Sequence, residues 1–165
     1  MARDDQVLAA LGRALKLEQD GYAFYTQAAA RVQDPTCKQT MLSLADDEKI
    51  HEAMIVRQLE AMSEEGDFVV LPNVEPVHAD LAAAILPPDP AQVEQRVSEH
   101  ADELDALLLA MEVEVRSYDL YRQGAAETAS PAGREMYQWL AAAEMTHFNL
   151  LMSNYEALNT PSSWV

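Results

Sequence analysis

Hydrophobic side chains recur every three or four positions in four long stretches of this chain. Residues 4–31, 35–62, 98–127 and 131–158 each carry such a stripe, with polar residues between its members. This spacing is that of one face of an α-helix. The first and third stripes are formed by Leu11, Leu15, Tyr22, Tyr25 and Ala29, and by Leu107, Met111, Tyr118, Tyr121 and Ala125. The pattern predicts an all-α fold with four helices.

Proline marks the expected helix boundaries. Asp34-Pro35 and Ser130-Pro131 each place a capping side chain before a proline. This order is typical of a helix start, because proline fits the first helical position. Asn159 and Pro161 are expected to end the last helix and leave a short tail at residues 159–165.

A proline-rich linker at residues 64–96 separates the two halves and holds five of the eight prolines. A helix of about 28 residues is about 42 Å long, and about 13 extended residues cover that distance. The linker can therefore return along the whole bundle and leave the second and third helices parallel. The short links make helical pairs 4–62 and 98–158 antiparallel within one domain, 1–165. Leu81 to Leu86 is expected to form a helical turn.

The same motif occurs twice, 96 residues apart. Each copy is a Glu followed 30 residues later by Glu-x-x-His. The six repeated residues are Glu18, Glu48, His51, Glu114, Glu144 and His147. Their neighbours repeat as well, since Tyr22 and Tyr25 return as Tyr118 and Tyr121. The repeat predicts a pseudo-twofold axis between the two helical pairs.

All four repeated carboxylates fall on the apolar faces of their helices. Glu18 lies three residues after Leu15 and four before Tyr22, and Glu48 lies four after Leu44. Buried carboxylates are unfavourable by several kcal/mol unless they are paired or bound to metal. Few basic residues share these faces. Four carboxylates and two imidazoles are therefore predicted to bind two divalent ions, for which iron or manganese is suited.

Composition excludes several classes of function. The formal net charge of −17 argues against a nucleic-acid partner, because phosphate backbones are bound by Lys and Arg. Cys37 is the only cysteine, so no disulfide framework or cysteine metal cluster forms within the chain. We expect no membrane span, because no apolar run approaches about 18 residues, and no signal peptide. A cytoplasmic protein is the expectation.

The chain resembles the ferritin-like superfamily, and most closely rubrerythrins without the rubredoxin domain. The phrases LEQDGYAFYTQAA, LADDEKIHE, MEVEVRSYDLY and LAAAEMTH carry the resemblance. It implies a ferritin-like four-helix bundle in which the six repeated residues are the metal ligands. Glu48 and Glu144 would bridge two iron ions. Tyr25 and Tyr121 resemble tyrosines whose hydroxyls steady the ligand carboxylates, although core packing is an equal alternative for them.

Two departures from the family pattern limit what the resemblance implies. Many rubrerythrins have a further Glu three residues after the third-helix ligand, and here Ser117 and its repeat partner Gly21 occupy these places. The family's redox-linked ligand shift is therefore not expected. A cysteine-rich electron-transfer domain cannot be built from one cysteine. Electrons would come from an external donor or from ferrous iron.

The resemblance implies an oxidoreductase that reduces hydrogen peroxide or dioxygen at a di-iron centre. A ferroxidase or iron-storage protein is one alternative, and a structural metal-binding module is another. A manganese site with catalase-like activity is a further option. We expect a homo-oligomer, with a dimer favoured over a ferritin-like shell, because no fifth helix follows Leu158.

Other histidines and tyrosines provide comparisons for these assignments. Glu75 and His78 also form a Glu-x-x-His, but they lie in the linker, where i and i+3 are not aligned by a helix. They are not predicted to bind metal, and His100 is expected to be exposed. Tyr22 and Tyr118 are interpreted as packing residues.

Overall fold

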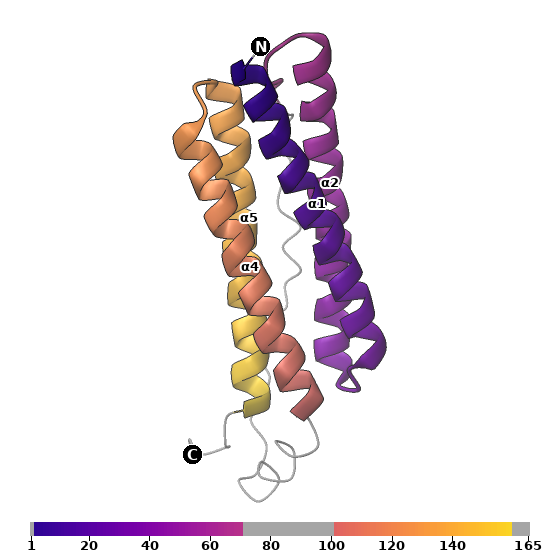
Figure 1. Cartoon of the computed structure of the whole chain (residues 1–165). Coiled ribbons are helices and arrows are strands. Elements are labelled where there is room, and N and C mark those ends of the chain that lie inside the picture. Colours follow the sequence, from indigo (N-terminus) through magenta and orange to yellow (C-terminus); the bar gives the residue numbers. More distant parts are fainter. Residues whose placement is uncertain (1, 71–100, 160–165) are drawn as a thin grey trace, which may run out of the picture.

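Four long helices form the part of the chain that the computed structural model describes, residues 2–70 and 101–159. The helices are α1 (Ala2–Arg31), α2 (Pro35–Glu64), α4 (Ala101–Glu127) and α5 (Pro131–Asn159). They form a bundle of two pairs, and the predicted fold class is confirmed (Figure 1). The predicted starts at Pro35 and Pro131 agree with the structure, whereas α2 ends two residues beyond the expected Met62.

Several sequence predictions fall outside the described residues. These are the linker from residue 71 onward with its expected turn at 81–86, the Glu75–His78 pair, the exposure of His100, and the tail from residue 160. None of the helices in the described part of the chain is long and apolar enough to cross a membrane.

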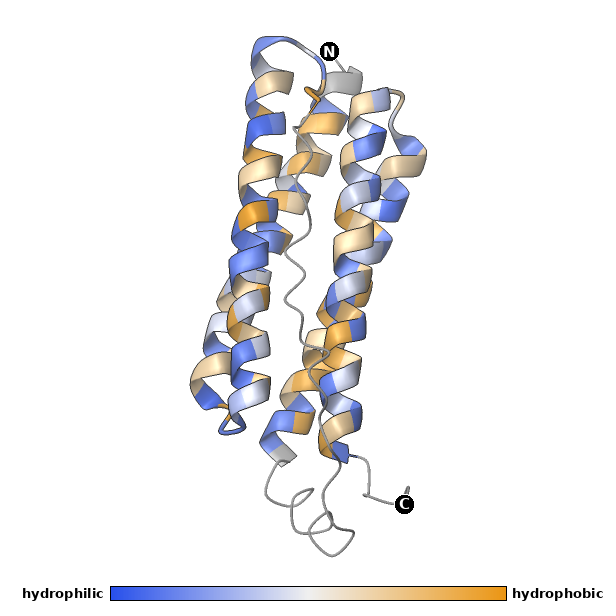
Figure 2. Ribbon diagram, turned by 180° about the vertical axis from the view of Figure 1, so that it is seen from behind, coloured by the Kyte–Doolittle hydropathy of each residue, from blue (hydrophilic) through white to orange (hydrophobic). Residues whose placement is uncertain are grey.

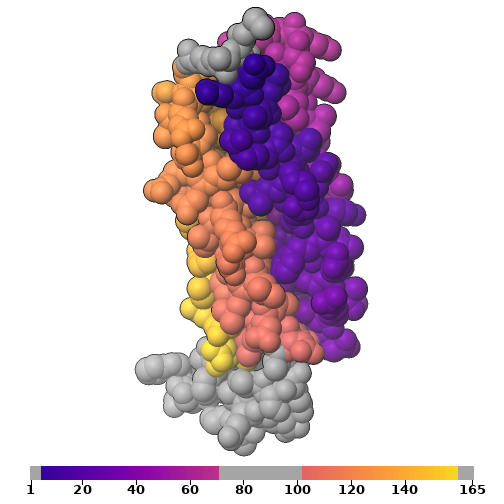
Figure 3. All heavy atoms as spheres, in the orientation of Figure 1, coloured from indigo at the N-terminus to yellow at the C-terminus, as the bar shows by residue number. Residues whose placement is uncertain are grey.

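The helices run in the directions expected for two antiparallel pairs joined by a long crossover. Helix α1 packs along α2, and α4 packs along α5, in two close antiparallel pairs. The pairs meet where α1 lies against α4 and α2 lies against α5. Figure 3 shows α1 and α4 side by side on one face. Helices α2 and α4 run in the same direction, as predicted (Figure 1).

The predicted caps fix the starts of α2 and α5. The Asp34 carboxylate accepts a hydrogen bond of 2.8 Å from the backbone N–H of Cys37, and Pro35 takes the first helical position. At the start of α5 the Ser130 hydroxyl lies 3.4 Å from the backbone nitrogen of Gly133. Capping side chains satisfy N–H groups that have no partner within the helix.

The hydrophobic core is divided into two clusters, one toward each end of the bundle. The first cluster includes Tyr25, Leu44, Leu107 and Leu151, and the second includes Leu11, Ile55, Tyr121 and Leu140. Each of these eight residues has its 96-residue repeat partner in the opposite cluster. The pseudo-twofold axis therefore exchanges the ends of the bundle. Figure 2 shows hydrophobic residues on the inward sides of the helices.

Two buried polar side chains hold the connections against the bundle. The Gln58 amide exchanges hydrogen bonds of 2.8 and 2.9 Å with the backbone of Val69, and so fixes the chain just after α2. The Glu103 carboxylate of α4 accepts bonds of 2.6 and 3.3 Å from the backbone nitrogens of Gln33 and Asp34. Glu103 thereby joins the α1–α2 connection to the other helical pair.

Candidate metal centre

The six repeated Glu and His residues meet in the interior of the bundle. Each residue is at most 5% exposed, and the four helices all contribute. They form two overlapping sets whose ligand atoms lie within 4.8 Å of one another. We call these sets the His51 position (Glu18, Glu48, His51 and Glu144) and the His147 position (Glu48, Glu114, Glu144 and His147). Glu48 and Glu144 belong to both sets.

At the His51 position the imidazole already contacts carboxylates. The Nδ1 atom of His51 lies 3.1 Å from Glu18 Oε2, within hydrogen-bond distance, and 3.3 Å from Glu144 Oε1. Glu48 on the preceding turn of α2 is 3.5 Å away. The i, i+3 spacing brings this carboxylate and imidazole together because both project from one helix face.

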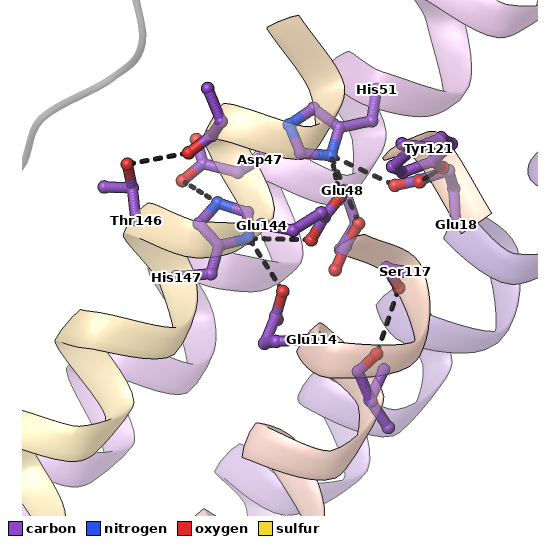
Figure 4. Close-up of polar contacts among 12 residues, drawn as sticks. Glu18, Asp47, Glu48, His51, Glu114, Ser117, Tyr121, Glu144, Thr146 and His147 are labelled. Carbon is purple, nitrogen blue, oxygen red and sulfur yellow. Dashed lines mark hydrogen bonds and ion pairs between the residues drawn. The ribbon is translucent and has the colours of Figure 1, made fainter. Parts of the chain in front are cut away.

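At the His147 position the ligand atoms are close but not hydrogen-bonded. The Nδ1 atom of His147 lies 3.5 Å from Glu114 Oε2 and 3.4 Å from Glu144 Oε2. The rings of His51 and His147 lie nearly parallel, with centroids 5.4 Å apart (Figure 4). Both histidines direct the same nitrogen, Nδ1, at Glu144, which belongs to both sets.

The two repeated tyrosines cross between the helical pairs. The hydroxyl of Tyr25 on α1 donates to Oε1 of Glu114 on α4, and the hydroxyl of Tyr121 on α4 donates to Oε1 of Glu18 on α1. Both tyrosines are fully buried and also belong to the two core clusters. Each therefore orients a carboxylate in addition to packing, which unites the two alternatives considered from the sequence. Tyr22 and Tyr118 pack at the edges of these clusters.

Asp47 is a functional candidate that the sequence analysis missed. Its Oδ2 atom lies 3.3 Å from Nε2 of His147, on the side of the ring away from the cluster (Figure 4). A carboxylate on the far nitrogen orients a metal-binding imidazole and raises its basicity. The repeat concealed Asp47, because its partner 96 residues later is Ala143. Its position directly before the Glu-x-x-His was the available signal.

The electrostatics of the cluster reflect four buried carboxylates without enough positive charge. Burial, together with neighbouring carboxylates, raises the pKa of Glu18 and of Glu114 well above the usual value. Burial alone would lower the pKa of His51 and of His147, but their carboxylate partners outweigh it and raise both. Burial opposes ionisation of Glu144 as well, yet its partners Glu114, His147 and His51 lower its pKa. Protons thus supply positive charge that metal ions would supply instead.

The donor set fits a pair of metal ions. Four buried ligand atoms have no hydrogen-bond partner among the described residues: Glu114 Oε2, both carboxylate oxygens of Glu144, and His147 Nδ1. Unpartnered buried polar atoms are rare and need an explanation. Here they converge on the space between the carboxylates, and four carboxylates with two imidazoles suit iron or manganese.

The places of the additional family Glu hold small residues. A Cβ atom at Gly21 would lie 3.0 Å from Glu48 Oε1, so glycine allows this carboxylate to rest against α1. The Ser117 hydroxyl donates to the backbone oxygen of Val113 at 3.1 Å. Neither residue supplies a fifth carboxylate.

The fold and the cluster together define a ferritin-like carboxylate protein with the features of a dinuclear metal site. The Rubrerythrin family model matches residues 9–155, so the chain belongs to the rubrerythrin family. A solved structure described as a hypothetical protein from Pyrococcus furiosus is similar, with a TM-score of 0.64 and 25% identity. The match covers 90% of this chain and 87% of that one. The search of curated proteins found no match.

Proposed function

We propose that this protein is an oxidoreductase that reduces hydrogen peroxide or dioxygen at a di-iron centre. The main support is the pair of overlapping four-residue sets that share Glu48 and Glu144. A dinuclear arrangement suits peroxide because its reduction to two waters takes two electrons and two protons, and each ferrous ion supplies one electron. The electrons are restored by an external donor.

The residues have distinct roles in this proposal. Glu18 with His51, and Glu114 with His147, would hold one ion each, and Glu48 and Glu144 would be shared by the two ions. When bound, the iron pair supplies the electrons and open coordination positions. Tyr25 and Tyr121 fix the orientation of the terminal carboxylates through their hydroxyls. The two core clusters on either side exclude bulk water from the site.

A direct test is peroxide consumption by protein loaded anaerobically with ferrous iron. We expect one peroxide consumed for each pair of ferrous ions, with loss of this stoichiometric phase in Glu114→Gln. Glu112→Gln is the matched control, because Glu112 lies on the same helix but is exposed in an ion pair with Arg116. Equal peroxide consumption in both variants would contradict the proposal.

Ferroxidase activity linked to iron storage is the alternative, favoured by the absence of an additional Glu at Gly21 and Ser117. The native mass and the iron content after aerobic loading distinguish the two functions. For the oxidoreductase we expect a dimer holding about two iron ions per chain. A shell of roughly 24 chains with a large excess of iron would instead support storage.

A further inference from the structure

The two metal positions have matching ligands but different surroundings. Asp47 contacts the far nitrogen of His147 at 3.3 Å. The repeat partner of Asp47 is Ala143, which has no polar side chain. No carboxylate among the described residues contacts Nε2 of His51, and its ring instead meets Trp139 edge-on at 5.5 Å. The residues around the two histidines therefore do not follow the internal repeat, although the ligands do.

The ligand atoms of the two positions also differ in their hydrogen bonding. At the His147 position, His147 Nδ1 and Glu114 Oε2 have no hydrogen-bond partner among the described residues. At the His51 position, Nδ1 of His51 is hydrogen-bonded to Glu18 Oε2 at 3.1 Å. A metal ion can enter the His147 position without breaking a hydrogen bond between ligands. Entry into the His51 position must break the bond between His51 and Glu18.

We propose that the protein loads its two metal ions in order, with the His147 position binding first and more tightly and the His51 position exchanging more readily. This inference rests on the proposed dinuclear site. Asp47 acts as a positioning residue. Its carboxylate lies against Nε2 of His147 and favours a proton on that nitrogen, which leaves the lone pair of Nδ1 directed at the metal position. Partners of this kind typically contribute 10–100-fold to metal affinity.

The test is titration of the metal-free protein with Mn²⁺, monitored by calorimetry and by electron paramagnetic resonance. We expect two affinities in the wild type, with an isolated-ion signal at one equivalent and an exchange-coupled signal at two. Asp47→Ala introduces the residue that the second half of the repeat already has at position 143. It should lower the affinity for the first Mn²⁺ ion 10–100-fold. Asp46→Ala, an exposed neighbour, should leave both affinities unchanged.

The histidine variants locate the first ion. His51→Ala should retain one ion at wild-type affinity, and His147→Ala should lose the tight one. The reverse result, or two equal wild-type affinities, would overturn the order of loading. Thermal unfolding of each metal-free variant checks that it is folded. Ordered binding of two ions without peroxide turnover would refute the proposed activity and leave the order intact, whereas no binding by the wild type would refute both.

Discussion

At the scale of single residues, the tyrosine hydroxyls connect the helical pairs through the metal site. Tyr25 and Tyr121 each donate to a carboxylate on the helix of the other pair. Burial raises the pKa of Tyr25 well above its ordinary value, as does the nearby charge of Glu114, so its hydroxyl remains a donor. A donor of this kind is needed because a fully buried carboxylate oxygen is otherwise unsatisfied.

Removing either hydroxyl should destabilise the protein. Tyr25→Phe leaves Glu114 Oε1 without its donor, and Tyr121→Phe does the same to Glu18 Oε1. We expect each change to lower the free energy of unfolding by about 1–3 kcal/mol, measured by denaturant titration of the metal-free protein. Tyr22→Phe is the control, because the Tyr22 hydroxyl bonds to none of the six cluster residues and its ring is only half-buried. Equal losses in all three variants would show that packing alone explains the effect.

The residues that sequence could predict are those that the repeat duplicates. Glu18 and Glu114 are recognisable because each interrupts an apolar stripe and recurs at the same offset. Asp47 could not be found this way, because it lies beside the stripe and has no repeat partner. Its contact with His147 depends on how α2 packs against α5, which spacing along one helix does not specify.

At the scale of elements, glycines decide how closely the segments approach. Gly133, near the start of α5, packs under Phe68, the apolar residue that follows α2. A Cβ atom there would lie 2.8 Å from the Phe68 ring. Gly12 lies within α1, and a Cβ atom there would meet nothing within 4 Å. Replacing each of the two glycines by alanine should therefore have opposite effects on the stability of the protein.

The glycine pair gives a matched prediction. Gly133→Ala should displace Phe68 and lower the free energy of unfolding by about 1–3 kcal/mol, the usual effect of overpacking. Gly12→Ala should raise it by up to about 1 kcal/mol, because alanine favours the helix. Denaturant titrations of the two variants measure both changes. A stabilising Gly133→Ala would contradict the packing of Phe68 described above.

The helix positions were predictable because their signals are local. The caps at Asp34 and Ser130 and the following prolines lie within a few residues of the helix starts. The side chains that hold the segments between helices against the bundle could not be predicted from the sequence. Gln58 bonds to Val69 across the end of α2, and Glu103 reaches the α1–α2 connection from the other pair. Such contacts depend on tertiary packing rather than on periodicity.

At the scale of the whole molecule, the bundle places an unfavourable polar cluster between two apolar ones. The four buried carboxylates disfavour the metal-free fold unless protons or metal ions balance their charge. A ligand that binds only the folded state stabilises it by mass action. The protein should therefore be markedly more stable with metal than without it.

Metal should raise the melting temperature. With free Mn²⁺ at 100 times its dissociation constant, each bound ion adds about 2.7 kcal/mol, which raises Tm by roughly 5–10 °C in a chain of this size. Calorimetry of metal-free and metal-loaded protein measures the shift. Glu144→Ala removes a carboxylate shared by both positions, so its shift should be largely lost. An undiminished shift in that variant would indicate binding to the acidic surface, where the net charge of −17 also attracts cations.

We expect the six repeated residues to bind two metal ions. Anomalous scattering at the iron and manganese edges, recorded from crystals of protein produced with ample iron, tests this expectation most directly. We expect two iron peaks within bridging distance, each contacted by its histidine and its terminal carboxylate, with Glu48 and Glu144 between them. A cluster without anomalous peaks, or a single ion bound elsewhere on the chain, would contradict this account.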